Sequence, residues 1–233
     1  MKRFYAEVSV APAAEGYRVL LNGRPVRTPK RRALQLPTRA LAEAVAAEWQ
    51  AQVEEVDPRT MLLTRLITTA IDVLPERRPQ IIAELLEFAR HDVLCYRVTH
   101  PRELVARQCA AWDPWLAWAA REYGVHLQVT SGIAAVPQEE TALARLRAVV
   151  EEFAPLPLIG LHAAARITHS LVLALALARQ AVDAAEAFRL AHLEELWEIA
   201  QWGEEGEQRK RHKALQAELH AASLLLQAAG QPN

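Results

Sequence analysis

The segment from His192 to Lys213 carries side chains that could bind a metal ion. His192 and Glu195 are three residues apart and Glu198 adds another turn, so one helical face would present an imidazole and two carboxylates. A di-iron bundle needs Glu-x-x-His on two helices and a glutamate from each of two others. The nearest second row, in "ELLEFARH", has the wrong spacing from glutamate to histidine. Because carboxylate rows on helices are usually solvated, we expect neither a metal nor a cofactor.

Nucleophilic and nucleotide chemistry also lack their usual patterns. Ser131 and Ser170 have no nucleophile elbow around them. Cys95 and Cys109 lie in the apolar helical contexts that are typical of inert buried thiols. The sequence contains neither a P-loop nor a GxGxxG motif. We therefore expect no catalytic residue and no enzyme activity. The alternative, if the protein is an enzyme, is a metal-dependent hydrolase.

A local basic run, "RTPKRR" at residues 27–32, could contact phosphate or an acidic protein surface together with Arg24. Charges on an edge strand also block unwanted strand pairing. We favour a solvated hairpin edge for this run.

Three tryptophans, Trp112, Trp115 and Trp118, recur at every third position and would form a wide aromatic face. Such a face belongs more often to a hydrophobic core than to a ligand site. We expect it in the core, with Asp113-Pro114 interrupting the helix at a packed corner.

Trp202 begins the most unusual stretch. Gly203 is predicted to end a helix with a left-handed cap, and Glu204, Glu205 and Glu207 then open the next helix, where the macrodipole favours anions. An exposed tryptophan ringed by carboxylates has the composition of a protein-binding hot spot, in which the aromatic ring anchors and the charges select the partner. A well-capped structural corner explains the same residues equally well from composition alone.

Composition narrows the class of protein. The 233 residues can form one or two domains, and 52% hydrophobic with 24% charged residues is the balance of a folded chain. The net charge of −1 provides no general basic field for nucleic acid or anionic membrane. Two cysteines without CxxC spacing fit a reducing compartment.

Two segments indicate where in the cell the protein is expected. The N-terminus, "MKRFYAEVSV", shows no apolar or amphipathic leader, so we expect neither export nor organelle import. The apolar stretch at residues 157–178 is interrupted by His162, Arg166 and His169, which would be costly in hydrocarbon. We expect it to be one buried central helix.

The chain changes its hydrophobic period near residue 38. Residues 4–36 alternate as strands and turns, and Asn22-Gly23 is a strong hairpin signal. Thr38 is then a plausible N-cap for the first helix. The sequence therefore predicts an α+β fold, with a small antiparallel β-rich N-terminal domain at 1–37 and a larger multihelical C-terminal domain at 38–233. A short strand segment at 125–136 could rejoin the first sheet.

The helical region should contain several proline-opened helices and four later ones. We expect the later helices at residues 139–153, 157–178, 184–203 and 206–229. Asp183 and Glu186 form a capping box for the third of these.

Six segments, in order, resemble a known family: the assembly chaperone of F-type ATP synthase, which holds the α subunit of the soluble catalytic sector before it joins β. They are "GRPVRTPKRRALQLPTRALAEAVAAEW", "LLTRLITTAID", "DVLCYR", "QCAAWDPWLAW", "SLVLALAL" and "LEELWEIAQWGEE". The family usually has proline where this chain has Leu62, and glycine where it has His169. It usually has glutamine and a later glutamate where this chain has Glu198 and Ala200.

The resemblance implies a β-rich N-terminal domain, a helical C-terminal domain, no catalysis and no cofactor. It implies the ATP synthase α subunit as partner, and neither nucleic acid nor membrane; we expect a monomer when free. Family members occur in mitochondria and in certain bacteria, and the excess of arginine over lysine makes a bacterial cytoplasm our expectation. A general scaffold or holdase with other clients is the remaining alternative.

The resemblance also turns the Trp202 stretch into a predicted docking surface for the partner. Trp49 is expected to fix the two domains together and to shape that surface indirectly. The predicted docking residues are Glu195, Trp202, Gly203, Glu204, Glu205 and Glu207.

Overall fold

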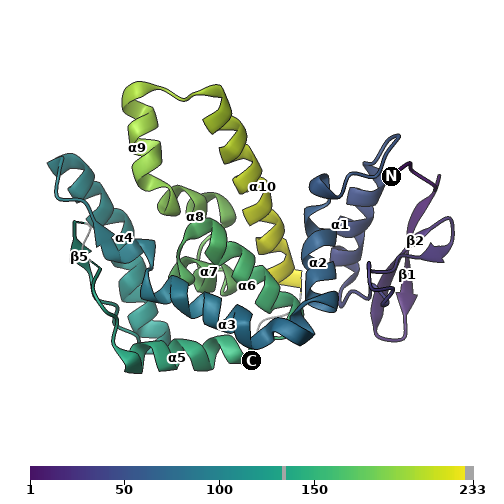
Figure 1. Ribbon diagram of the computed structural model, residues 1–233, viewed down its shortest axis with the longest axis horizontal. Helices are drawn as coiled ribbons and strands as arrows, with labels where there is room; N and C mark the ends of the chain where they lie inside the picture. Colours follow the sequence, from purple (N-terminus) through teal and green to yellow (C-terminus); the bar gives the residue numbers. More distant parts are fainter. Residues whose placement is uncertain (133–134, 229–233) are drawn as a thin grey trace.

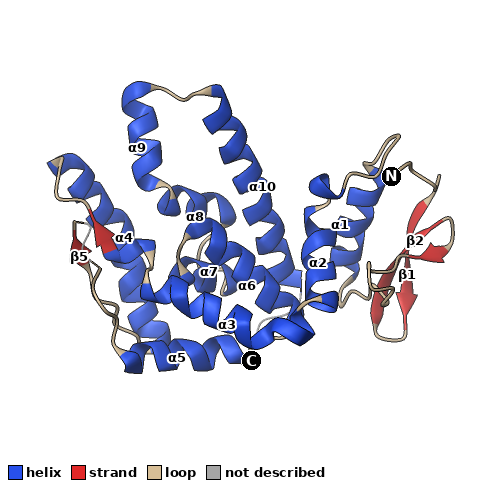
Figure 2. Cartoon of the chain, in the orientation of Figure 1, coloured by secondary structure: helices blue, strands red, loops and turns tan. Residues whose placement is uncertain are grey.

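The computed structural model describes residues 1–132 and 135–228. A small antiparallel sheet lies at the N-terminal end, and α-helices form the larger remainder, so the predicted α+β class is confirmed (Figures 1 and 2). The strands of this sheet are β1 (Val8–Ala13), β2 (Gly16–Leu21) and β3 (Arg24–Pro25).

The helices of the described chain follow the sheet, with a two-strand pair among them. They are α1 (Arg39–Gln50), α2 (Leu62–Asp72), α3 (Leu74–Arg90), α4 (Arg102–Tyr123), α5 (Glu140–Glu151), α6 (Pro155–Thr168), α7 (Leu171–Ala178), α8 (Ala184–Ala191), α9 (Leu193–Trp202) and α10 (Gly206–Ala228). Short 3-10 turns lie at Pro58–Thr60 and Val93–Cys95, and the paired strands are β4 (Tyr96–Arg97) and β5 (Thr130–Ser131).

The hairpin between β2 and β3 turns at Asn22 and Gly23, whose φ angles of 48° and 74° are those that the sequence signal requires. The hairpin prediction is therefore confirmed. The Asn22 side chain also accepts hydrogen bonds from the N–H groups of Ala6 and Glu7, both at 3.0 Å. These bonds fix the start of β1 against the turn.

The first two helices are capped by side chains that precede them in the chain. Thr38 is the N-cap of α1, and its hydroxyl accepts a hydrogen bond from the N–H of Leu41 (3.2 Å), as predicted. Glu48 of α1 accepts hydrogen bonds from the N–H groups of Leu63 and Thr64 at 2.7 and 2.8 Å. Because Met61 provides no side-chain cap for α2, Glu48 serves as its cap and locks the two helices together.

The basic side chains of the run at 27–32 are exposed, as expected for a solvated edge, but the run also contacts α2 and α3. The hydroxyl of Thr28 donates to buried Asp72 at 2.8 Å, and the N–H of Lys30 donates to the same carboxylate at 2.9 Å. The Lys30 ammonium pairs with Glu76 at 2.8 Å. These contacts attach the loop after β3 to α2 and α3.

The apolar stretch at 157–178 forms the centre of the helical part, but as two helices instead of one. His169 adopts a φ of 50° and ends α6, and the Ser170 hydroxyl then caps α7 by accepting from the N–H of Leu173 (2.9 Å). Buried Asp92 accepts hydrogen bonds from the Ser170 hydroxyl and the Val172 N–H. A complete cap at this point is more stable than a continued helix.

Three other helix boundaries differ from prediction. The segment 184–203 breaks at His192, giving α8 and α9. Helix α4 continues through Asp113-Pro114, and Pro79 lies inside α3. A proline inside a helix removes one backbone hydrogen bond, and at Pro114 the packing of Trp112 and Trp118, both buried as expected, outweighs that loss.

Strand β5 lies within the predicted 125–136 strand segment but does not join the first sheet. It pairs in parallel with β4, through Tyr96–Thr130 and Arg97–Ser131. The suggested return to the N-terminal sheet was therefore wrong. The division between residues 37 and 38 stays a prediction, with α1 beginning at Arg39 and packing on β1 and β2.

Among the described residues, no helix is both long enough and apolar enough to cross a membrane.

Candidate functional site

Helices α9 and α10 form a hairpin that projects from the helical body (Figure 1). All residues of α9 are described, and Leu193 is its one buried residue. The later part of α10 packs on α6, close enough that Gly160 faces Leu226 and Ala222. The free end of the hairpin therefore presents its side chains to solvent, while its base is anchored in the core.

Trp202 ends α9 at this free end and is 87% exposed. Gly203 follows with φ 87° and ψ 168°, so the predicted left-handed cap was wrong. These angles lie in a region that is essentially restricted to glycine. The chain leaves α9 through Gly203 in an extended conformation, and α10 starts at Gly206.

An open groove lies between the end of α9 and the start of α10. Six of the seven predicted partner-binding residues line it, so the structure brings these six together. The groove is lined by Glu195, Glu198, Ile199, Trp202, Gly203, Glu204, Glu205, Glu207, Gln208 and Arg211.

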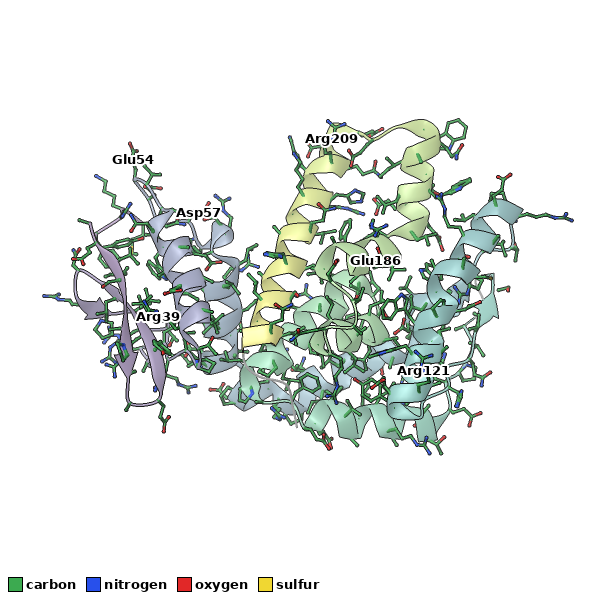
Figure 3. The ribbon with its side chains drawn as sticks, turned by 180° about the vertical axis from the view of Figure 1, so that it is seen from behind. Arg39, Glu54, Asp57, Arg121, Glu186 and Arg209 are labelled. Atoms are coloured by element: carbon green, nitrogen blue, oxygen red, sulfur yellow. The ribbon has the colours of Figure 1, made fainter. Side chains whose placement is uncertain are left out.

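Two carboxylates at the corner already have cationic partners in the chain. The Arg209 guanidinium bonds to Glu204 at 2.7 Å, and the Lys210 ammonium bonds to Glu207 at 2.7 Å. The Arg209 hydrogen bond is the main reason that the pKa of Glu204 is lowered. Arg209 lies near the loop that connects α9 and α10, at the top of Figure 3.

Glu195, further down α9, is held by α10. Arg211 donates to both of its carboxylate oxygens at 2.7 and 2.8 Å, and Gln208 donates at 3.2 Å. Burial alone would raise the pKa of Glu195, but the hydrogen bond from Gln208, the neighbouring His212 and the charge of Arg211 lower it. Glu198 and Glu205 form no ion pair within residues 1–132 and 135–228.

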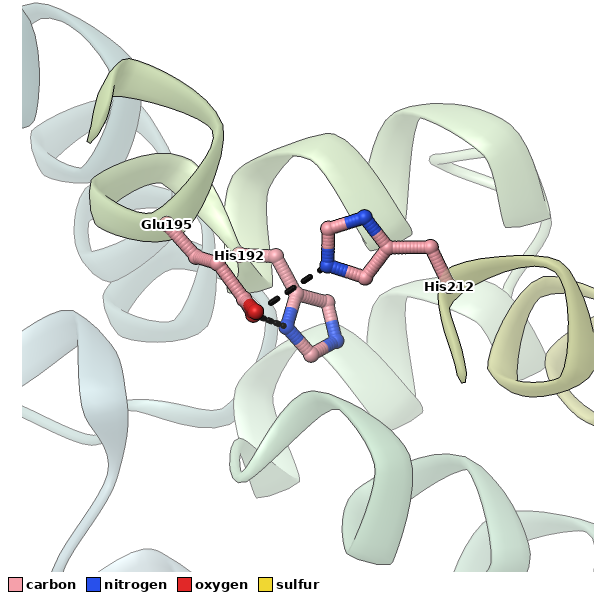
Figure 4. Close-up of side chains that lie close together, drawn as sticks. All are labelled: His192, Glu195 and His212. Atoms are coloured by element: carbon pink, nitrogen blue, oxygen red, sulfur yellow. Dashed lines mark ion pairs between the residues drawn. The ribbon is translucent and has the colours of Figure 1, made fainter. Parts of the chain in front are cut away.

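A second cluster lies at the base of the same hairpin (Figure 4). One oxygen of Glu195, Oε2, lies 3.5 Å from His192 Nδ1 and 3.2 Å from His212 Nε2. One ligand atom from each residue lies within 4.8 Å of the other two. Two imidazoles and a carboxylate at such distances could hold a divalent transition-metal ion.

The N-terminal half of the chain matches a known family model. The family model described as ATP12 chaperone protein matches residues 2–120, which is about half of the chain. The protein belongs to the ATP12 chaperone family. The family resemblance inferred from the six sequence segments is thereby confirmed.

Solved structures extend the ATP12 likeness beyond residue 120. The crystal structure of Atp12 from Paracoccus denitrificans is 36% identical with a TM-score of 0.89, and the match covers 98% of each chain. A point mutant of that protein matches equally well. The Atu1473 protein from Agrobacterium tumefaciens is 38% identical with a TM-score of 0.92, over 98% of this chain and 86% of that one. These matches include the hairpin.

In this ATP12-family chain, Trp49 lies apart from the groove, in α1. Its ring packs edge-on against Tyr5 at 5.7 Å between ring centroids, and its carbonyl accepts a hydrogen bond from the Tyr5 hydroxyl at 2.7 Å. Trp49 also lines a pocket with residues of β2 and β3. It joins the sheet region to α1, so any effect on the groove is indirect.

Sequence reasoning missed His212 as a neighbour of His192 and Glu195. His192 and Glu195 are three residues apart at the start of α9, whereas His212 belongs to the next helix. The sequence signal that could have placed His212 beside Glu195 was the predicted turn between the two helices. Glu195 precedes Glu204 by nine residues and His212 follows it by eight, so an antiparallel turn at Glu204 places the two side by side.

Proposed function

We propose that this protein is a chaperone for the free α subunit of an F-type ATP synthase, which it protects from aggregation until the subunit pairs with β. It needs no ATP hydrolysis and is not an enzyme. Membership of the ATP12 chaperone family supports the class of function. The observation that carries the docking proposal is Trp202, 87% exposed beside an acidic groove at the free end of a helix hairpin.

The physical task is to cover an interface that lacks its partner. An isolated α subunit exposes the surface that β should cover, and large exposed apolar patches drive aggregation. A chaperone that releases its client without ATP must bind less tightly than β and the finished ring. A partly polar interface, selected by charge, suits that requirement.

The groove offers such an interface. Trp202, exposed at the end of α9, supplies an apolar anchor. Glu205 is exposed and unpaired among the described residues, so it is free to pair with a basic side chain of the client. Glu207 pairs with Lys210, but an exposed ion pair contributes only about 0–1 kcal/mol, so a client cation can replace it. Glu204 is only partly exposed and pairs with Arg209.

The two remaining predicted residues act from behind this surface. Glu195 is held by Arg211 and fixes the position of α10 relative to α9. Trp49 fixes the sheet region on α1. We place the protein in a bacterial cytoplasm as a monomer when free, with the α subunit as its client and neither nucleic acid nor membrane as a partner.

Co-expression with the cognate α subunit tests the proposal. Wild type should keep the α subunit in the soluble fraction, and the charge reversal Glu204→Lys, Glu205→Lys and Glu207→Lys should not. A matched control reverses three exposed glutamates near the sheet, Glu7, Glu15 and Glu54, and changes the net charge equally.

Three results would contradict the proposal or part of it. If the corner variant folds normally and protects as well as wild type, the acidic corner is not the docking surface. If wild type protects unrelated aggregating proteins as well as the α subunit, the protein is a general holdase. If a pull-down from its own cytoplasm contains no ATP synthase subunit, the client is wrong.

A further inference from the structure

We propose that His192, Glu195 and His212 form a binding site for a divalent transition-metal ion, with zinc as the best match. His192 and Glu195 come from the start of α9, and His212 comes from α10, so the ion would join the two helices of the hairpin. Two histidines and one glutamate form a common zinc ligand set, in which solvent takes the fourth position. This proposed metal site does not depend on which protein the chaperone binds.

The distances within the cluster suit a tetrahedral ion. Zinc-to-nitrogen and zinc-to-oxygen bonds of about 2.0–2.1 Å place neighbouring ligand atoms about 3.3 Å apart. Glu195 Oε2 lies 3.5 Å from His192 Nδ1 and 3.2 Å from His212 Nε2. The three ligand atoms lie within 4.8 Å of one another, so closing the histidine-to-histidine edge needs a shift of at most about 1.5 Å.

His212 provides independent support, because it is buried and its ring points into the cluster (Figure 4). Its Nε2 atom has no hydrogen-bond partner in the described part of the chain, although Glu195 lies nearby. The other ring nitrogen, Nδ1, lies 3.4 Å from Glu204 Oε1. With a metal ion on Nε2, the Glu204 carboxylate would accept the remaining ring proton at Nδ1, which is the arrangement seen around metal-ligating histidines.

The surroundings hold the ligands in position. Both imidazole rings contact Phe188, at centroid distances of 4.3 Å for His192 and 5.5 Å for His212. Arg211 donates to both carboxylate oxygens of Glu195, more closely to Oε1, while Oε2 is the oxygen that faces the histidines.

A bound ion would act as a clip at the base of the hairpin. The cluster lies on the core side of the groove, and Glu195 lines both the groove and the cluster. Coordination would therefore fix the separation of α9 and α10 below Trp202.

The test uses the full chain without an affinity tag, stripped with a chelator and dialysed. Titration with Zn²⁺ in a calorimeter should give one equivalent, and Co²⁺ should give the visible absorption of a tetrahedral site. His212→Gln and Glu195→Gln should each weaken binding at least 100-fold, and Glu204→Gln about 10-fold. His220→Gln, exposed on the same helix, is the matched control and should bind as wild type does.

The proposal is overturned if wild type binds less than one equivalent of either ion. It is also overturned if Glu195→Gln binds as tightly as the His220→Gln control. Because buried His212 could be needed for folding, circular dichroism of each variant accompanies the titration, and the partly exposed Glu195 variant decides if His212→Gln fails to fold. If the two histidines only hydrogen-bond to Glu195 and bind no metal ion, the titration will show less than one equivalent bound.

Discussion

Replacing Trp202 by alanine separates client binding from folding. The side chain is 87% exposed, so its removal should change the free energy of unfolding by no more than about 0.5 kcal/mol. In an interface a tryptophan buries about 200 Å², which at about 25 cal/mol per Å² corresponds to about 5 kcal/mol gross. Truncation at a hot spot usually costs about 2–4 kcal/mol of binding free energy, or a roughly 30- to 1,000-fold loss of affinity.

The measurement is the dissociation constant of the complex with the cognate α subunit, together with a thermal melt of each variant. Phe4→Ala is the matched control, because Phe4 is 62% exposed but lies in the sheet region, near Tyr5. We expect Phe4→Ala to bind as wild type does. If Trp202→Ala keeps the wild-type melting temperature and binds within threefold of wild type, the tryptophan is not an anchor.

Three further predictions concern the scaffold. Glu48→Ala should lower the free energy of unfolding by about 1–3 kcal/mol in urea titrations, because the N–H groups at the start of α2 lose their cap. Gly203→Ala should speed amide hydrogen exchange at the end of α9 while leaving the global melting temperature unchanged. An alanine at the Gly203 φ of 87° is strained, and this strain affects only the connection between α9 and α10. Burial raises the pKa of Asp92 to about 6 from 3.8, so its stabilising contribution is complete below pH 3.8 and is lost as the pH rises through 6. The stability of wild type relative to Asp92→Asn should fall by about 2 kcal/mol between pH 4 and pH 7, and an unchanged difference would refute this.

Local signals predicted much of the fold. The change from a two-residue to a 3.6-residue period near Thr38 separated strands from helices, because each period reflects which face of an element is buried. The turn at Asn22 and Gly23 and the cap at Thr38 depend on neighbouring residues alone, and both are as predicted. Trp112 lies in the core, where its size and apolar surface place it.

The misjudged features depend on residues distant in sequence. The break at Ser170 is stabilised by Asp92, and α4 continues through Pro114 because its tryptophans are packed on other helices. No periodicity within one segment could reveal either effect. The predicted docking residues did come together around one groove, since most of them are neighbours in sequence at a helix end, where local reasoning is strongest.

One turn explains why the groove and the histidine cluster lie on the same hairpin. An antiparallel return at residues 203–205 pairs positions at equal distances on either side, so that Glu195 meets Arg211 and His212. The tip has few buried contacts, which leaves it free to meet a client, but such a segment opens easily. Charged and imidazole contacts at the base offset that weakness without burying the tip. The same carboxylate, Glu195, therefore both defines the groove and anchors its walls, and changes at Glu195 should affect the two together.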